Sequence, residues 1–278
     1  MTWTFGSDLT AFLVAARPAV AARPVANTLL LTVTEALERL GPHAFGEQDP
    51  LYGWWTGPDG VVAGALLCTP PRPLLTGALP PEAVRDLAAV LGTEPSLSGV
   101  RGFNGRRRDV EVLTAAWGRP VVTEYQRLYR LGGLVAPSPA PSGRARTAVG
   151  ADLPLLLTWL EAFRVEADPA GSVSEALVRD RLAYGGILLW EDAGTPVSLA
   201  GFSRPASGAA RVGPVYTPPD ARGRGHAAAV THAASEAASA RGASEVLLFT
   251  DLANPTSNGV YLRIGYVPVE DRAVAVAR

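Results

Sequence analysis

The sequence lacks lysine altogether and contains a single cysteine. All 25 cationic side chains among the 278 residues are therefore arginine, which excludes a phosphate-binding GxxxxGK[ST] loop and any Schiff-base chemistry on the protein. The lone Cys68 cannot form an intrachain disulfide, and three widely separated histidines give no zinc-ligand spacing. We therefore expect no metal site and a reducing, cytoplasmic environment.

The sequence also has almost no net charge and no long apolar run. The 25 cationic and 26 acidic side chains leave a formal net charge of −1, which removes the electrostatic argument for a nucleic-acid or membrane-surface partner. No stretch approaches the roughly 18 apolar residues that predict a membrane span. The N-terminal segment carries Asp8 and no cation before Arg17, which makes it a poor signal peptide. We expect a soluble protein with neither a nucleic-acid nor a membrane partner.

Length and one Pro/Ser-rich segment predict two domains. A chain of 278 residues is about twice the usual domain size of roughly 100–150 residues. The segment VAPSPAPSG at 135–143 favours extended, semi-rigid structure. We predict domains at 1–135 and 145–278, joined by a linker at 136–144.

Both halves show the same order of expected elements. In the N-terminal half, Asp8 is a suitable N-cap for a helix, and two short apolar runs flank the turn Pro58-Asp59-Gly60, which predicts a hairpin. In the C-terminal half, the runs GGILLWED and VSLAGFSRP precede a strand, an Ala-rich helix and another strand. Paired prolines at 80–81 and 218–219 each stand before such a helix. We therefore predict an α/β fold with two mixed-sheet domains that are copies of one unit.

The two copies differ at the turn before this helix. The second copy continues as RGRGHA at 222–227, whereas the first has no glycine there and carries Glu82 and Asp86. Gly223 and Gly225 let the backbone approach a ligand closely, and the N–H groups at a helix N-terminus attract anions. The pattern predicts a pyrophosphate site in the second copy only. Taken alone, the four residues RGRG at 222–225 are also explained as an ordinary basic turn that caps the helix.

Together with the next helix, this loop resembles the acetyl-CoA-binding core of the GNAT acetyltransferases. The R/Q-x-x-G-x-G/A loop of that superfamily is met by residues 222–227. The Asn, the small residue three positions later and the Tyr seven positions later are met by Asn254, Ser257 and Tyr261. The resemblance covers residues 209–269. It implies a tandem GNAT protein whose N-terminal copy is degenerate and whose sheets are mostly antiparallel.

The resemblance implies an N-acetyltransferase that moves an acetyl group from acetyl-CoA directly to an amine, expected on a small molecule. Val215 would meet the acetyl oxygen, Thr217 the pantetheine arm, and Tyr261 the departing thiolate. Because a thiol titrates near pKa 8.5 and a phenol near 10, Tyr261 would act by a hydrogen bond as much as by full proton transfer. The implied cofactor-binding residues are Val215, Tyr216, Thr217, Arg222, Gly223, Arg224, Gly225, His226, Ala227, Ala228, Asn254 and Ser257.

The general base is not identified by the sequence. Many relatives carry a Glu on the strand before the loop, whereas residues 209–214 contain no carboxylate. Glu166 and Asp251 are candidates for the base, and Glu191 is a third. Each is also explained as a solvated surface charge, because acidic side chains seldom lie buried without a partner.

Two other functions remain open at this stage, as do the acceptor and the choice between monomer and homodimer. A non-catalytic acyl-CoA sensor or interaction module is favoured by the missing strand carboxylate and disfavoured by Tyr261. A dinucleotide-binding fold is matched by Gly223-x-Gly225-x-x-Ala228 with Asp251 ending the next strand. However, only 27 residues follow Asp251, too few for the remaining βαβ units.

Overall fold

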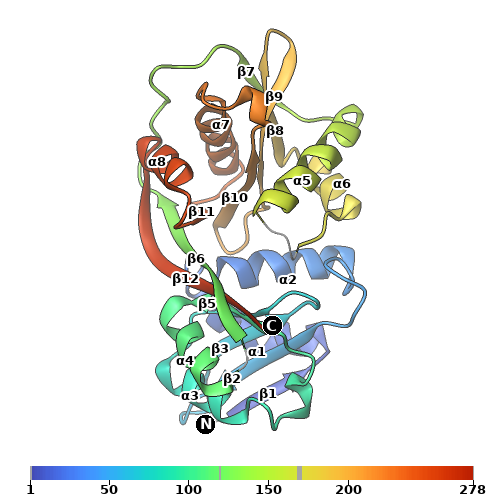
Figure 1. Cartoon of the computed structure of the whole chain (residues 1–278). Coiled ribbons are helices and arrows are strands. Elements are labelled where there is room, and N and C mark those ends of the chain that lie inside the picture. The colour runs from blue at the N-terminus through green and yellow to red at the C-terminus, as the bar shows by residue number, and fades with distance from the viewer. Residues whose placement is uncertain (1, 119, 168–170, 278) are drawn as a thin grey trace. The chain divides into compact units, whose positions relative to one another are not determined.

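The computed structural model describes residues 2–118, 120–167 and 171–277 (Figure 1). The chain forms two compact units. Unit 1 consists of Met1–Arg127 and Glu270–Arg278, and unit 2 consists of Leu128–Val269. Two strands, β6 (Pro120–Leu131) and β12 (Tyr266–Ala277), each run from one unit into the other.

Unit 1 is built on strands in the order β1-β2-β3-β4-β5-β12. Neighbouring strands are antiparallel, except that β4 and β5 are parallel. Its elements besides β6 and β12 are β1 (Thr2–Gly6), α1 (Leu9–Ala21), α2 (Thr28–Leu40), β2 (Leu51–Thr56), β3 (Val62–Cys68), β4 (Leu74–Thr76), α3 (Pro81–Val90), β5 (Gly102–Arg106) and α4 (Arg107–Trp117).

Local side-chain chemistry explains where these elements begin and turn. The Asp8 carboxylate accepts a hydrogen bond from the Thr10 N–H at 2.7 Å and caps α1. Between β2 and β3, Asp59 accepts from the Val61 N–H at 3.1 Å, and Gly60 takes a positive φ of 77°. Both the helix cap and the hairpin confirm the predictions from the sequence.

Unit 2 repeats this design with strands in the order β6-β11-β10-β9-β8-β7. The pair β10–β11 is parallel, and β7–β8, β8–β9 and β9–β10 are antiparallel. A mixed, mostly antiparallel sheet is thus confirmed for both units and excludes a doubly wound dinucleotide-binding fold. Its elements besides β6 and β12 are β7 (Arg144–Thr147), α5 (Leu153–Ala167), α6 (Glu175–Ala183), β8 (Ile187–Asp192), β9 (Thr195–Phe202), β10 (Ala209–Tyr216), α7 (His226–Ala240), β11 (Glu245–Asp251) and α8 (Pro255–Arg263).

Side chains of the unit 2 strands alternate between two faces, as the period of two in a β-strand requires. Leu188 and Phe202 pack with the apolar side of α7. Leu189 and Leu199 pack instead with residues of α5 and α6. The helices therefore cover opposite faces of these strands (Figure 1).

The two units share their order of elements around the parallel strand pair. In unit 1, α3 connects β4 to β5, and in unit 2, α7 connects β10 to β11. The helix starts differ, because α3 begins at Pro81 with Glu82 in its first turn, whereas α7 follows Gly225. An acidic first turn without glycines is unsuited to an anion.

The Pro/Ser-rich segment predicted as a linker at 136–144 lies within unit 2. The Trp190 Nε1–H donates to the Ser142 carbonyl oxygen at 2.8 Å, and Gly143 takes a φ of 99° against the backbone of Glu191. The segment is therefore attached to the strands beside it. The domain bounds 1–135 and 145–278 stay a prediction about the two copies.

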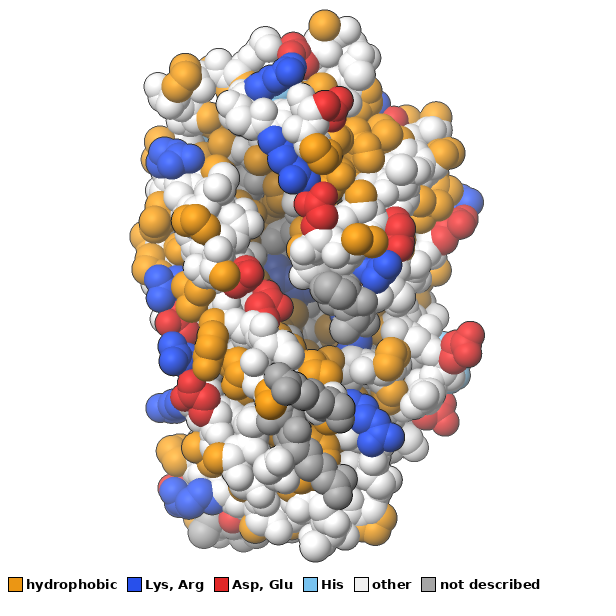
Figure 2. All heavy atoms as spheres, in the orientation of Figure 1, with side chains coloured by type: hydrophobic (Ala, Val, Ile, Leu, Met, Phe, Trp, Pro, Cys, Tyr) orange, Lys and Arg blue, Asp and Glu red, His pale blue; other side chains and the backbone are white. Residues whose placement is uncertain are grey.

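Charged side chains of both signs are interspersed on the face seen in Figure 2 rather than gathered by sign. This distribution agrees with the net charge of −1. Within the described residues, none of the helices has the length and apolar character needed to cross a bilayer.

Candidate active site

The turn before α7 has the backbone shape that its glycines suggested. Gly223 and Gly225 have φ values of 75° and 83°, a region that side chains with a Cβ rarely adopt. A Cβ on Gly223 would meet no atom within 4 Å, so this residue faces open space, whereas a Cβ on Gly225 would lie 3.6 Å from the Cβ of Pro141. No side chain caps α7. Its first N–H groups are therefore available to an anion.

The two arginines of this turn differ in their partners. Arg224 is exposed and has no ion-pair or hydrogen-bond partner in the described part of the chain. Arg222 instead donates from Nη2 to both carboxylate oxygens of Glu166, at 2.9 and 2.8 Å. Its Nε–H donates to the Thr217 carbonyl oxygen at 2.8 Å. Arg224 is thus the freely available cation, and Arg222 is already engaged.

His226, the first residue of α7, turns its side chain inward. The residue is 2% exposed, and its Nδ1 has no hydrogen-bond partner in the part of the chain that the structure describes. Only its backbone N–H can therefore take part in an anion site at the helix start. Ala227 and Ala228, which follow in the first turn of α7, are half-buried.

Strands β10 and β11 pair over a short distance only. Residues 209–211 pair with 245–247, and among the described residues no pairing of these strands continues beyond them. The register of β10 against β9 also shifts between Val212 and Val215, where Pro214 has no N–H to donate. The edge of residues 213–217 is therefore open on the β11 side, which leaves backbone groups for a ligand.

Ser198 fixes the end of this open edge, although the sequence did not single it out. It is fully buried on β9, and its hydroxyl donates to the Tyr216 carbonyl oxygen at 3.0 Å. The Ser198 and Thr217 hydroxyl oxygens are also hydrogen-bonded, at 2.8 Å. The sequence signal for this role was a serine within a largely apolar strand, because a buried hydroxyl needs a hydrogen-bond partner.

Tyr261 lies on α8 and is 9% exposed. Its ring meets that of Tyr266 edge-on, with centroids 6.2 Å apart, and it belongs to the apolar cluster against which Val215 packs. No hydrogen-bond partner of its hydroxyl occurs within the described ranges. Burial raises the pKa of Tyr261 to about 12, so the phenol keeps its proton at neutral pH and is a weaker acid than a free tyrosine. It is therefore better suited to donate a hydrogen bond to a thiolate than to transfer its proton outright.

Asn254 and Asp251 both stabilise the start of α8. The Asn254 side-chain oxygen accepts from the Ser257 N–H at 3.0 Å, which is an N-cap interaction. The Asp251 carboxylate accepts from the Ala253 N–H at 2.8 Å. The Asn254 amide N–H groups remain available to bind a ligand.

Asn258, a further residue that the sequence analysis missed, joins this turn to β6. Its Nδ2 donates to the carbonyl oxygens of Asp251 and Asn254, at 2.8 and 2.7 Å. Its Oδ1 accepts from the Tyr129 hydroxyl at 2.8 Å. Because both the oxygen and the nitrogen of its side-chain amide are hydrogen-bonded, Asn258 orients α8, the helix that carries Tyr261.

All three base candidates have partners in the structure. Glu166 pairs with Arg222, and Asp251 stabilises its own turn. Glu191 accepts from the Arg146 Nε–H at 2.5 Å, and the same guanidinium holds the Asp152 carboxyl and lowers its pKa. No group of three or more His, Cys, Asp or Glu side chains within the described residues is placed to hold a metal ion.

Comparisons with known proteins bear on the matched part of the chain and on the whole fold. Residues 153–266 match the acetyltransferase (GNAT) family, and this segment includes the turn before α7, Asn254 and Tyr261. The comparison with curated proteins gives no match.

Solved structures similar to the chain cover nearly its full length. A GNAT-family acetyltransferase from Colwellia psychrerythraea is 13% identical with a TM-score of 0.63, over 100% of this chain and 99% of that one. A GCN5-related N-acetyltransferase from Sphaerobacter thermophilus is 18% identical with a TM-score of 0.64, over 98% and 94%. A tandem GNAT protein from the clavulanic acid biosynthesis pathway is 14% identical with a TM-score of 0.57, over 99% and 97%.

The fold and the matched segment define an acyltransferase. More particularly, the similarity of residues 153–266 is to the acetyltransferase (GNAT) family. The family resemblance drawn from the loop and the helix motif is thereby confirmed, and the architecture of the whole chain is that of GNAT proteins.

Proposed function

We propose that the protein is an acetyl-CoA-dependent N-acetyltransferase that moves an acetyl group directly to the amine of a small molecule. One observation carries the catalytic part of this proposal. Tyr261 is a buried phenol without a hydrogen-bond partner in the described chain, and it shares an apolar cluster with Val215 on the open edge of β10. A proton donor and a row of backbone groups thus lie in one unit.

The turn before α7 is suited to the pyrophosphate of acetyl-CoA. A Cβ on Gly223 would meet no atom within 4 Å. Among the described residues, no side chain caps the first N–H groups of α7, and Arg224 has no competing partner. In this proposal the phosphates bind at residues 222–228, and the pantetheine arm follows Thr217, Asn254 and Ser257 along β10 and α8.

Acetyl-CoA supplies the acetyl group as a thioester, and the residues of this chain act on its two ends. In the proposal, the N–H of Val215 stabilises the negative charge that develops on the carbonyl oxygen during attack by the amine. The Tyr261 hydroxyl donates to the sulfur as the carbon–sulfur bond breaks. The attacking nitrogen loses one proton, for which Glu166 and Asp251 stay the proposed acceptors, with water as the relay.

Binding of acetyl-CoA is tested at Gly225. Because α3 has the acidic first turn of Glu82, we expect calorimetry to find one site per chain. Gly225→Asp adds a negative charge where the phosphate would bind. Gly225→Asn adds a side chain of the same size without the charge, and Asn tolerates the left-handed conformation. We expect Asp to abolish binding and Asn to retain most of it. Two sites per chain, or equal binding by both variants, would contradict the proposal.

A non-catalytic acyl-CoA sensor is the alternative, and it is favoured by the engagement of Glu166 with Arg222. The two functions differ in whether bound acetyl-CoA turns over. A thiol-release assay with acetyl-CoA and a panel of small amines separates them. Thiol release that depends on the added amine supports the transferase. Tight binding of acetyl-CoA without thiol release in the presence of any amine supports the sensor.

A further inference from the structure

Tyr129 is a buried residue of β6 that is hydrogen-bonded to α8. The residue is 2% exposed, and its hydroxyl donates to the Asn258 Oδ1 at 2.8 Å. In the sheet, β6 lies beside β11, and α8 follows β11 in the chain. A hydrogen bond from a buried side chain on a strand to a side chain on a helix fixes how the two elements lie against each other. Tyr129 therefore ties α8 to the sheet.

The bond from Tyr129 also sets the direction of the Asn258 amide. Because Oδ1 accepts from Tyr129, Nδ2 is directed to the turn that leads from β11 into α8. There it donates to the carbonyl oxygens of Asp251 and Asn254, at 2.8 and 2.7 Å. An Asn amide has one oxygen and two N–H groups, and Asn258 uses both kinds at once. It thus links the position of β6 to the start of α8.

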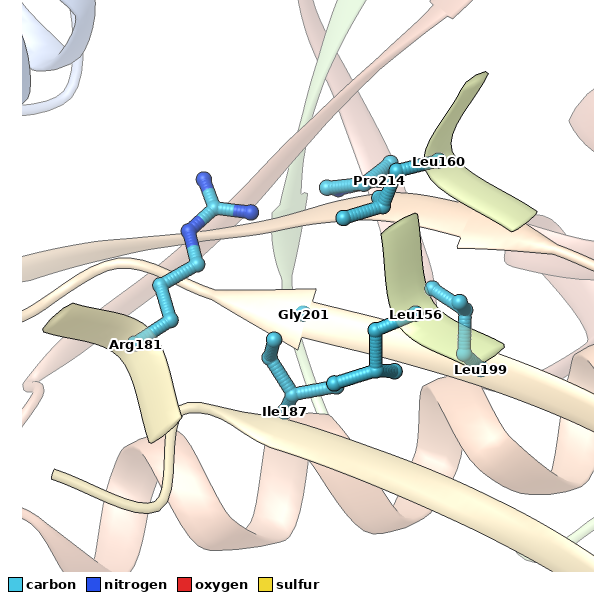
Figure 3. A pocket seen from close by; sticks show the side chains of 7 residues that line it. All are labelled: Leu156, Leu160, Arg181, Ile187, Leu199, Gly201 and Pro214. Atoms are coloured by element: carbon cyan, nitrogen blue, oxygen red, sulfur yellow. The ribbon is translucent and has the colours of Figure 1, made fainter. Parts of the chain in front are cut away.

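Tyr261 follows Asn258 by three residues, so the two side chains are neighbours on the surface of α8. Tyr129 and Tyr261 belong to the same apolar cluster. Figure 3 shows the other side of β8 and β9, where a separate cluster brings Leu156 of α5 together with side chains of those strands. The bond from Tyr129 therefore acts on the side of the sheet that carries Tyr261, and its loss should leave the packing of α5 intact.

From this arrangement we propose that Tyr129 is a positioning residue for acetyl transfer, which acts through Asn258 to hold the Tyr261 hydroxyl at the thioester sulfur. The inference rests on the proposed function, because it takes Tyr261 as the donor to the departing thiolate. Within the described chain the Tyr261 hydroxyl has no hydrogen-bond partner, so its place depends on how α8 is held. A misplacement of about 1 Å at a reacting group can lower a rate by about 100-fold.

The first experiment uses Tyr129→Phe, which keeps the ring and removes only the bond to Asn258. With acetyl-CoA and the amine of the panel that wild type accepts best, kcat should fall by about 5- to 50-fold, a part of what a general acid contributes. The dissociation constant of acetyl-CoA, measured by calorimetry, should stay within about threefold. Tyr266→Phe is the matched control, because it also loses one buried hydroxyl bond, but to Ser235 of α7. It should keep kcat near that of wild type.

The second experiment places Tyr129→Phe in the Tyr261→Phe background. There it should lower kcat by less than about twofold, because the hydroxyl that it positions is gone, whereas a purely structural role predicts the same loss in both backgrounds. Amide hydrogen exchange gives a further readout that needs no turnover. Tyr129→Phe should speed exchange in residues 255–263 more than in α7, and Tyr266→Phe should do the reverse.

Three outcomes overturn the inference while the proposed function stands. The first is kcat of Tyr129→Phe within about twofold of wild type, the second is an equal loss of kcat in both backgrounds, and the third is unchanged exchange in α8. Failure of the proposed function differs, because then no amine of the panel causes thiol release by the wild type, and the inference falls with it.

Discussion

Arg222 in the turn before α7 is paired with Glu166 near the end of α5, with its Nη2 within 2.9 Å of both carboxylate oxygens. A cation predicted for the phosphates and a carboxylate predicted as a base therefore neutralise each other. Both side chains are nearly half exposed, at 47% and 45%. Water thus screens the pair, and a pyrophosphate can compete with Glu166 for the guanidinium.

We predict that Glu166→Gln strengthens acetyl-CoA binding, because it removes the competing carboxylate. Exposed ion pairs contribute about 0.2–1 kcal/mol, so the dissociation constant should fall by up to about fivefold in calorimetry. Glu161→Gln is the matched control, since Glu161 lies on the same helix and pairs with Arg164. Weaker binding by Glu166→Gln would mean instead that Glu166 positions Arg222 for the phosphate.

Arg224 should account for much of the salt dependence of acetyl-CoA binding. Exposed charges are screened over about 8–10 Å near physiological ionic strength, so the wild-type dissociation constant should rise with salt. Arg224→Gln should bind more weakly at low salt and show a flatter dependence. Arg85→Gln, at an exposed site of unit 1 that pairs with Glu82, should behave as wild type. A salt-insensitive wild type would count against this turn as the phosphate site.

The parts of the site that follow from local chemistry were predictable from the sequence. Gly223 and Gly225 have the positive φ values that glycine permits, and Asn254 and Ser257 sit at the first turn of a helix that presents Tyr261. These features depend on residues a few positions apart, so a motif records them directly.

The parts that depend on distant pairings were not predictable. Glu166 lies 56 positions from Arg222, and Ser198 of β9 is hydrogen-bonded to Thr217, which directly follows the neighbouring strand β10. The final strand, β12, runs over Tyr266–Ala277 and crosses from one unit to the other. Alternation of side chains indicates a strand but not which strands it will pair with. The sequence therefore did not show that the boundary of the compact units falls within β6, away from the predicted linker at 136–144.

Alkaline unfolding should depend on Tyr52, a buried residue of β2 whose pKa is raised to about 12 by burial. Because the folded-state pKa lies above the ordinary value near 10, stability from this group is complete below about pH 10 and is lost as pH rises towards about 12. Its hydroxyl has no hydrogen-bond partner among the residues that the structure describes. Tyr52→Phe should therefore cost little below pH 10 and reduce the alkaline loss. Chemical denaturation across pH measures this, and an unchanged pH dependence would contradict it.

Tyr261 offers the sharpest test of the proposed chemistry. Its hydroxyl would stabilise a thiolate that forms only as the bond breaks, and such an interaction raises turnover without strengthening ground-state binding. Tyr261→Phe keeps the ring and its packing, so the melting temperature and acetyl-CoA affinity should change little. Turnover should fall by about 10²- to 10⁴-fold, the usual contribution of general acid catalysis.

Tyr266→Phe is the matched control for this variant, because Tyr266 packs against Tyr261 and its hydroxyl is hydrogen-bonded to Ser235 at 2.7 Å. Loss of that buried bond should lower stability by about 1 kcal/mol and leave turnover near that of wild type. Since the pKa of Tyr261 is about 12, its proton stays available from neutral pH to about pH 10. The difference in turnover between Tyr261→Phe and wild type should therefore be constant over that range. Turnover of Tyr261→Phe within about twofold of wild type would show that the phenol only packs, and that water or the acceptor protonates the thiolate.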